Sequence, residues 1–156
     1  MDDDAPGEIA DVVAIRTTVD GGTPNVLVDL FHCKFSGEST PGRRVKDLYE
    51  LCGQAQKCVS WMSSPERQSD IFTHLLRRDA ARQEAAGPTR FELGTAEALR
   101  TILEVSRTNP VKLRVFIVQP GVSKADVSRA QLDLLSATEN HLMETFQIPF
   151  EVIASP

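Results

Sequence analysis

Two strand-like runs joined by a glycine turn constrain the fold of this 156-residue chain more than any other feature. Residues 9–18 and 25–35 are rich in β-branched and other apolar residues, and the segment between them contains Gly21 and Gly22. Adjacent glycines supply the positive φ angles that a tight reversal between two strands requires. The sequence therefore predicts an antiparallel hairpin near the start of the chain, with its turn over residues 19–24.

The pattern then changes to the three- and four-residue spacing of amphipathic helices, after a polar loop at 36–44. Caps and proline or glycine stops set the expected helix ends. Helices are predicted over 45–62, over 66–86, from the cap Thr95 to the stop at Asn109-Pro110, and over 125–146.

Two further apolar runs predict strands. Residues 111–118 are almost continuously apolar, which is typical of a central strand covered on both faces, and Gln119-Pro120-Gly121 is expected to end it. Residues 150–154 predict a final strand. The order of elements indicates an α/β fold, with a mixed central sheet that has an N-terminal antiparallel hairpin and is flanked by helices. We expect residues 1–8 to be a flexible lead-in and residues 9–156 a single domain.

The charge balance argues against a strongly basic nucleic-acid-binding surface. The chain has 17 Lys and Arg against 22 Asp and Glu, a formal net charge of -5. Five of those acids lie in the first eleven residues, which leaves 17 acids against 17 bases in the rest of the chain. Any binding to nucleic acid would therefore depend on local clusters of Lys and Arg.

The three cysteines indicate a reducing compartment, because an odd number cannot pair completely within the chain and their spacing is not that of a zinc finger. The first residues are acidic, unlike a secretion signal. No apolar run approaches the roughly 20 residues that cross a bilayer. We therefore expect a cytoplasmic protein with no membrane partner.

A carboxylate, an imidazole and an ammonium group are predicted to meet on the hairpin. His32 and Lys34 lie near the end of the second run, and because they are two residues apart they share one face of a strand, whereas Cys33 faces the other way. Asp11, near the start of the first run, is expected to lie alongside them across the hairpin. These three residues are the candidate catalytic cluster.

Two short motifs resemble those of the PD-(D/E)XK, or restriction-endonuclease-like, nuclease superfamily. They are Ile9-Ala10-Asp11 before the run Val12-Val13-Ala14-Ile15, and Leu30-Phe31-His32-Cys33-Lys34 on the next strand. Members place an Asp at the start of one strand and a Glu-x-Lys or Asp-x-Lys triplet on the following antiparallel strand, before a helix and a further strand. This chain departs from the pattern at His32, which stands where the second carboxylate would be.

Features beyond the motifs extend the resemblance. Some branches carry a site Gln on the following helix, and Gln54 and Gln56 occupy the matching helix here. Residues 115–156 are similar to the tails of large bacterial helicase-type or defence-associated proteins. The family often adds an acid from a helix before the Asp strand, and the chain begins too close to Asp11 to hold one. We therefore expect either that this acid is dispensable or that the chain is a segment of a longer protein.

The resemblance implies metal-dependent hydrolysis of phosphodiester bonds in nucleic acid. Asp11 and His32 would hold a divalent ion, Mg²⁺ or Mn²⁺, and Lys34 would orient the attacking water or stabilise developing charge. Because Mg²⁺ prefers oxygen ligands and imidazole suits softer ions, three interpretations of His32 stay open. It is a ligand of a softer metal, or it is a general base, or it belongs to a site that no longer cleaves nucleic acid.

Each candidate residue also has a structural reading. His32 would be a hydrogen-bonded, semi-buried residue and Lys34 a charge that protects the end of a strand. Gln54 and Gln56 would be solvent contacts. Arg43, Arg44 and Lys46 are expected to bind the phosphate backbone, or else to be the solvated start of a helix.

Two function classes remain after the sequence is considered. The first is a nuclease module of a DNA- or RNA-processing or phage-defence protein. The second is a catalytically decayed module that keeps the fold for docking onto a helicase or another domain of a larger protein. A nucleotide-binding domain has little support, because the chain has neither a P-loop nor a Gly-x-Gly-x-x-Gly turn.

Overall fold

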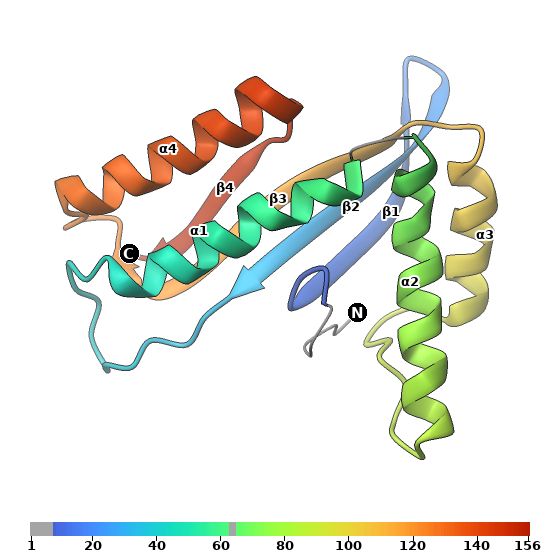
Figure 1. Ribbon diagram of the computed structural model, residues 1–156, viewed down its shortest axis with the longest axis horizontal. Helices are drawn as coiled ribbons and strands as arrows, with labels where there is room; N and C mark the ends of the chain where they lie inside the picture. The colour runs from blue at the N-terminus through green and yellow to red at the C-terminus, as the bar shows by residue number, and fades with distance from the viewer. Residues whose placement is uncertain (1–7, 63–64) are drawn as a thin grey trace.

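Four strands form a mixed sheet in the computed structural model, which describes residues 8–62 and 65–156 (Figure 1). The strand order is β1-β2-β3-β4, with β1 antiparallel to β2 and the other neighbours parallel. The elements are β1 (Val12–Asp20), β2 (Thr23–Cys33), α1 (Lys46–Cys58), the 3-10 helix η1 (Val59–Met62), α2 (Pro65–Glu84), α3 (Ala96–Ser106), β3 (Val111–Ser123), α4 (Arg129–Phe146) and β4 (Phe150–Ser155). The predicted α/β fold with its N-terminal hairpin is confirmed. Of the predicted lead-in, residues 1–7 lie outside the described residues.

The hairpin turn is tighter than predicted. Asp20 pairs with Thr23, so only Gly21 and Gly22 lie between the strands. Both glycines have positive φ angles, +57° and +86°. Two such residues are enough to reverse the chain in a turn whose twist matches that of the strands, and the predicted turn residues on either side therefore join the ladder.

The end of β3 differs from the prediction. The strand continues through Pro120 and Gly121 to Ser123, where it pairs with Ser155 of β4 after an irregularity in the register. A proline cannot donate a ladder hydrogen bond, and a bulge is one of the few places where a strand accepts it. Pairing with a distant strand therefore extended β3 beyond its local stop signal.

Local caps set the starts of two helices. Thr95 caps α3 as predicted, since its hydroxyl accepts a hydrogen bond from the Ala98 N–H. Helix α4 begins at Arg129 and not at residue 125, because Ser128 and Gln131 form a reciprocal capping box. The side chain of each accepts a hydrogen bond from the backbone N–H of the other, which satisfies two groups that a helix start leaves unpaired.

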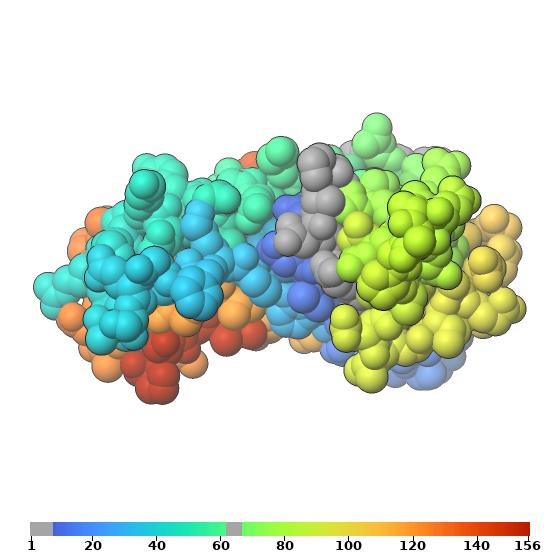
Figure 2. Space-filling model, turned by 90° about the horizontal axis from the view of Figure 1, so that it is seen from below, coloured from blue at the N-terminus to red at the C-terminus, as the bar shows by residue number. Residues whose placement is uncertain are grey.

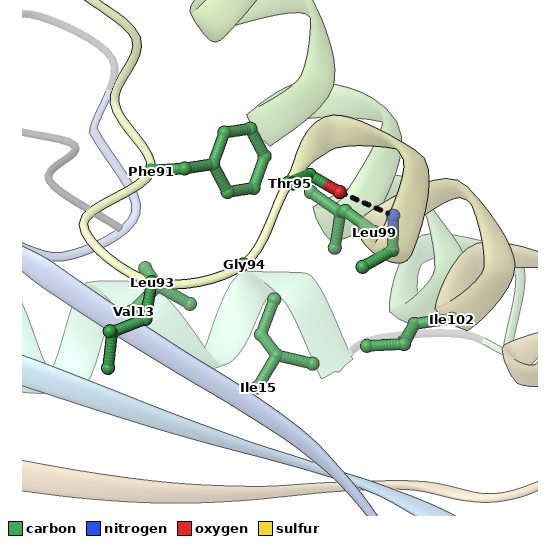
Figure 3. Close-up of a pocket in the computed structure, with 9 residues that line it drawn as sticks. Val13, Ile15, Phe91, Leu93, Gly94, Thr95, Leu99 and Ile102 are labelled. Atoms are coloured by element: carbon green, nitrogen blue, oxygen red, sulfur yellow. Dashed lines mark hydrogen bonds between the residues drawn. The ribbon is translucent and has the colours of Figure 1, made fainter.

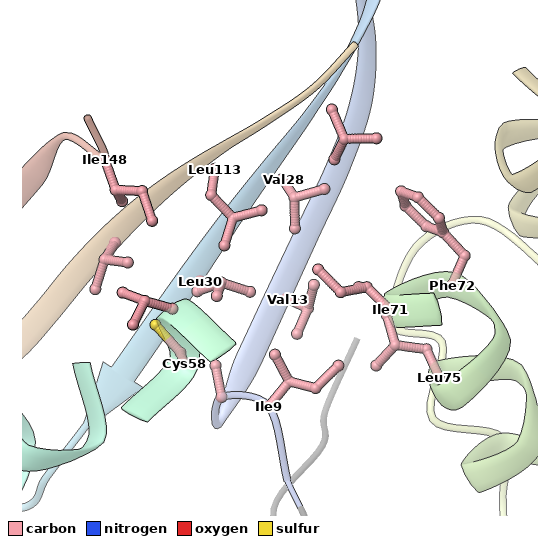
Figure 4. Close-up of a cluster of buried hydrophobic side chains, with 14 of the residues drawn as sticks. Ile9, Val13, Val28, Leu30, Cys58, Ile71, Phe72, Leu75, Leu113 and Ile148 are labelled. Carbon is pink, nitrogen blue, oxygen red and sulfur yellow. The ribbon is translucent and has the colours of Figure 1, made fainter. Parts of the chain in front are cut away.

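The α-helices of the described ranges pack on one face of the sheet (Figures 1 and 4). Alternate strand side chains meet the helices there, and burial of each large apolar side chain stabilises the fold by about 1.5–3 kcal/mol. The main cluster includes Val13, Val28, Leu30, Leu113 and Val115 from strands and Ile71, Phe72, Leu75, Leu99 and Leu142 from helices. A smaller cluster under α1 and α4 includes Leu48, Leu51, Cys52, Ile117 and Val122. None of the described helices is long and apolar enough to cross a membrane.

The prediction that β3 is covered on both faces is wrong. On the face away from the helices, the rings of Phe31 and Phe116 stack with centroids 4.6 Å apart. The Arg114 guanidinium lies over the Phe116 ring, 5.2 Å from its centroid. Phe116 is therefore buried by its own sheet neighbours, so an apolar residue at this position did not require a second helical layer.

The molecule has two distinct ends in the space-filling view (Figure 2). Residues that follow β2, in cyan and teal, lie at one end together with the red C-terminal strand. The green and yellow residues of α2, α3 and their connection occupy the other end. The carboxyl end of β2, where the candidate cluster was predicted, therefore lies away from the α2–α3 end.

Candidate functional site

Asp11 and His32 are neighbours at the end of the hairpin. The antiparallel ladder ends at the pair Val12–Phe31, and Asp11 comes just before it, close enough to His32 for its charge to act on the imidazole. The carboxylate is fixed in place, because its Oδ2 accepts a hydrogen bond of 2.7 Å from the Cys33 backbone N–H. The structure therefore brings together two of the three predicted residues, a carboxylate and an imidazole.

His32 is buried and neutral at neutral pH. Its side chain faces the helices and the residue is 2% exposed. Burial lowers the pKa of His32 to about 4, although the nearby charge of Asp11 acts to raise it. Its Nε2 has no hydrogen-bond partner among the described residues. A group with this pKa is a weak base at pH 7, so the environment favours a role as a nitrogen ligand over a role as a general base.

Lys34 pairs with a carboxylate that the sequence did not identify. Its ammonium group forms an ion pair with Glu50 of α1, and not with Asp11. Its backbone N–H donates to the Val118 carbonyl at 3.2 Å, which extends the β2–β3 ladder by one residue. The ammonium therefore lies beside α1 at the rim of the site, and a second acid lies there with it.

A network of hydrogen bonds holds the start of α1 over this edge of the sheet. The Gly42 N–H donates to the Gly121 carbonyl at 2.9 Å. The buried side-chain nitrogen of Gln131 donates to the carbonyls of Gly42 and Arg44, each at 3.0 Å. Because these bonds tie the loop before α1 to β3 and α4, they fix the helix that carries Glu50.

The two candidate glutamines lie on different sides of α1. Gln56 donates to the Thr138 hydroxyl of α4 at 3.4 Å, so it joins two helices. Residues two positions apart on a helix point in nearly opposite directions. Gln54 is half-buried, one turn beyond Glu50 on the same flank. Gln54 therefore lies on the flank of α1 that carries Glu50, and Gln56 lies on the flank that faces α4.

The candidate phosphate-binding cluster is largely paired with acids of the same chain. Arg43 forms an exposed ion pair with Asp126. Arg44 forms ion pairs with Glu38 and Asp47. Lys46, the first residue of α1, is exposed. A nucleic-acid backbone would have to displace these carboxylates before either arginine could bind it.

Gln119 is a site residue that the sequence reasoning missed. It is completely buried near the carboxyl end of the parallel pairing of β3 with β2, on the face that carries Val115 and Ile117. Its Oε1 accepts a hydrogen bond of 2.7 Å from the Gly121 N–H, and its Nε2 has no partner among the described residues. The available signal was a polar residue at a core position near the carboxyl end of a parallel strand, where ligands bind in α/β sheets.

Asp11 and His32 offer a cation one oxygen and one nitrogen ligand. Asp11 supplies a carboxylate, and His32 supplies a neutral imidazole whose Nε2 is unpartnered. The ranges 8–62 and 65–156 contain no group of three or more His, Cys, Asp or Glu side chains that could hold a metal ion. An imidazole ligand suits Mn²⁺ better than Mg²⁺, and oxygen atoms of water or substrate would have to complete the shell around an ion held by these two residues.

A separate pocket lies between β1 and the start of α3 (Figure 3). Its volume is about 110 Å³, and its lining is mostly apolar. The lining residues are Val13, Ile15, Phe91, Leu93, Gly94, Thr95, Ala98, Leu99 and Ile102. Because none of these side chains is an acid, a base or a metal ligand, the pocket adds no chemistry to the Asp11–His32 pair.

No protein-family model, curated protein or solved structure matches this chain. The resemblance to PD-(D/E)XK nucleases therefore stays a prediction from the motifs around Asp11 and Lys34.

Proposed function

We propose that this chain is a metal-dependent nuclease module that hydrolyses phosphodiester bonds in nucleic acid. The observation that carries the proposal is the meeting of Asp11 and His32. One is a carboxylate fixed by a backbone N–H, and the other is a buried imidazole with an unpartnered nitrogen. Such a pair is costly to keep in a purely structural role, because a buried polar atom without a partner costs about 1–3 kcal/mol.

The residues have separate roles in the proposed reaction. Asp11 and His32 would hold Mn²⁺ in preference to Mg²⁺. When bound, the ion would polarise a phosphoryl oxygen and lower the pKa of a bound water. Lys34 would turn its charge toward the phosphate. An exposed ion pair is worth only about 0–1 kcal/mol, so a polyanionic substrate can compete with Glu50 for the ammonium group.

Nucleic-acid binding by this module alone is expected to be weak and sensitive to salt. Arg43 and Arg44 would have to exchange Asp126 and Glu38 for phosphate oxygens, and the net charge of the chain is -5. We therefore propose that other domains of a larger DNA- or RNA-processing or phage-defence protein supply most of the affinity for the substrate.

A cleavage assay tests the proposal. Wild type is incubated with single- and double-stranded DNA and RNA, with Mn²⁺ or Mg²⁺. Cleavage is expected to be faster with Mn²⁺, and Asp11→Asn or Lys34→Ala is expected to slow it on the order of 100-fold. Addition of EDTA should abolish it.

The matched controls are Asp20→Asn and Lys112→Ala. Asp20 and Lys112 form an exposed ion pair 3.2 Å apart near the hairpin turn, at the opposite end of the strands. The two control substitutions remove the same kinds of charge far from the site, so the control variants should cleave at the rate of wild type. The nuclease proposal is wrong if neither metal supports cleavage, or if Asp11→Asn and Lys34→Ala cleave as fast as the controls.

A non-catalytic docking module is the second candidate. It is favoured by the sheet face opposite the helices, where Phe31 and Phe116 stack beside the exposed Val12. Ile153, also exposed, pairs with Val118 one step further along the same face. In this case wild type would cleave no substrate with either metal. A Val12→Glu, Ile153→Glu variant would then lose its binding to the helicase domain of its parent protein while Lys34→Ala kept it.

A further inference from the structure

Two buried side-chain nitrogens lie near the carboxyl ends of β2 and β3 without a hydrogen-bond partner among the described residues. They are Nε2 of His32, which is 2% exposed, and Nε2 of Gln119, which is 0% exposed. Buried polar groups are nearly always paired, and each one left unpaired costs about 1–3 kcal/mol. Two such atoms on neighbouring strands therefore point to a shared partner.

The register of the sheet brings the two side chains to the same face. His32 pairs with Ile117, and Gln119 lies two residues further along β3. Side chains two residues apart share a face, so Gln119 and His32 both point toward the helices. From the strand spacing and the rise per residue, their Cα atoms are roughly 8 Å apart.

The orientation of the Gln119 amide is fixed by its surroundings. Its Oε1 must receive the hydrogen bond from the Gly121 N–H, so its NH₂ group points away from Gly121. A Cβ atom at Gly121 would lie 2.8 Å from the Ser36 Oγ and 3.0 Å from the Gln119 Oε1. The absence of a side chain at Gly121 thus allows Ser36 and Gln119 to approach the backbone and clamps the amide.

We propose that Gln119 is a positioning residue of this site, whose side-chain N–H donates a hydrogen bond to an oxygen bound at the Asp11–His32 pair. The inference rests on the proposed function. An amide nitrogen only donates, so its partner has a lone pair. The His32 nitrogen and the Asp11 carboxylate instead suit a cation. The ligand that satisfies all three is a divalent cation that carries an oxygen atom, from either water or a phosphate group.

Mn²⁺ titration by calorimetry and electron paramagnetic resonance tests the proposal without measuring cleavage. The Gln119→Glu variant keeps an oxygen that accepts from the Gly121 N–H. It replaces the NH₂ donor by a second carboxylate oxygen of the same side chain, which can bind the metal. We expect it to bind Mn²⁺ about 10-fold or more tightly than wild type. The matched control, Gln56→Glu, adds the same carboxylate on the flank of α1 that faces α4 and should leave the affinity unchanged.

A second variant identifies the source of the oxygen. Gln119→Met removes the donor and keeps the size of the side chain. If the oxygen belongs to water, we expect the affinity of the Gln119→Met variant for Mn²⁺ to fall about 10-fold. If the oxygen belongs to phosphate, its Mn²⁺ affinity should stay unchanged, and binding of inorganic phosphate to the Mn²⁺-loaded protein should fall by about that factor.

A measurement on wild type covers the case in which these variants do not fold. Substoichiometric Mn²⁺ should broaden the side-chain amide signals of Gln119 in an NMR spectrum, but not those of Gln83, which donates to Asp79 in α2. The inference is overturned if the Gln119 signals stay sharp, or if both Gln119 variants bind Mn²⁺ and phosphate as wild type does.

The Asp11→Asn variant separates failure of this inference from failure of the proposed function. If wild type binds Mn²⁺ and Asp11→Asn does not, unchanged binding in the Gln119 variants refutes the role of Gln119 alone. If wild type binds no Mn²⁺ and cleaves no substrate, both proposals fail.

Discussion

At the scale of single residues, Asp29 is the most strongly held acid of the exposed sheet face. It is 3% exposed and accepts hydrogen bonds from Arg16 at 2.8 Å and from Arg114 at 2.7 and 2.8 Å. Burial alone would raise the pKa of Asp29, but the hydrogen bonds and charges of the two arginines outweigh burial and lower it below its ordinary value of 3.8. The ionised form therefore stabilises the folded state.

Asp29→Asn should lower the free energy of unfolding by about 2 kcal/mol at pH 7, because charge-assisted hydrogen bonds are lost. Since the folded-state pKa is lowered, the stabilisation is complete above the unfolded value near 3.8 and is lost as the pH falls through the folded value. Urea denaturation at pH 7 and pH 3 measures this. A difference between variant and wild type that stays the same at both values would contradict the assignment.

At the scale of elements, helix starts and hairpin turns follow from local residues. The end of a strand that is set by pairing with another strand does not. Gly21 and Gly22 predict the hairpin turn from sequence, and Thr95 predicts the start of α3. The end of β3 was missed, because its last residues pair with β4 and with Gly42, and pack against Ser36, all of them distant in sequence. Gly121 is the residue of β3 that approaches Ser36.

Gly121→Ala should therefore destabilise the protein by about 1–3 kcal/mol, since its Cβ would collide with Ser36 and Gln119 in a packed region. The comparison is Gly53→Ala, in the middle of α1, where a Cβ meets no atom within 4 Å. That change should raise the stability by about 0.5–1 kcal/mol, because alanine favours a helix. Chemical denaturation of both variants is the measurement. Equal effects would mean that β3 does not approach Ser36 this closely.

At the scale of the whole molecule, one apolar layer joins the sheet to the helices. Phe72 of α2 is fully buried in the cluster that contains Ile9, which precedes the hairpin, and Val13 of β1. That cluster joins the α2–α3 end to the strand that leads out of Asp11. Loss of packing there would therefore affect the fold and the position of the candidate site together.

Phe72→Ala should lower the free energy of unfolding by about 3–5 kcal/mol, because it leaves a cavity in this layer. Phe35→Ala changes a phenylalanine that is 90% exposed, and its effect should stay within about 0.5 kcal/mol. Thermal and urea denaturation of the two variants check the difference. Similar losses in both would contradict the packing of α2 against the hairpin.

The sequence by itself determined the hairpin and the α/β order, because turn chemistry and strand alternation act between near neighbours. Only the tertiary structure decided which groups complete the site. Lys34 meets Glu50 because α1 docks over the end of β2, and Arg43 meets Asp126 across 83 residues of sequence. Gln119 lies on the same face of the sheet as His32, two residues beyond its partner Ile117, because β3 lies beside β2 in parallel register. Such contacts depend on how distant elements pack, and no local pattern in the chain encodes that arrangement.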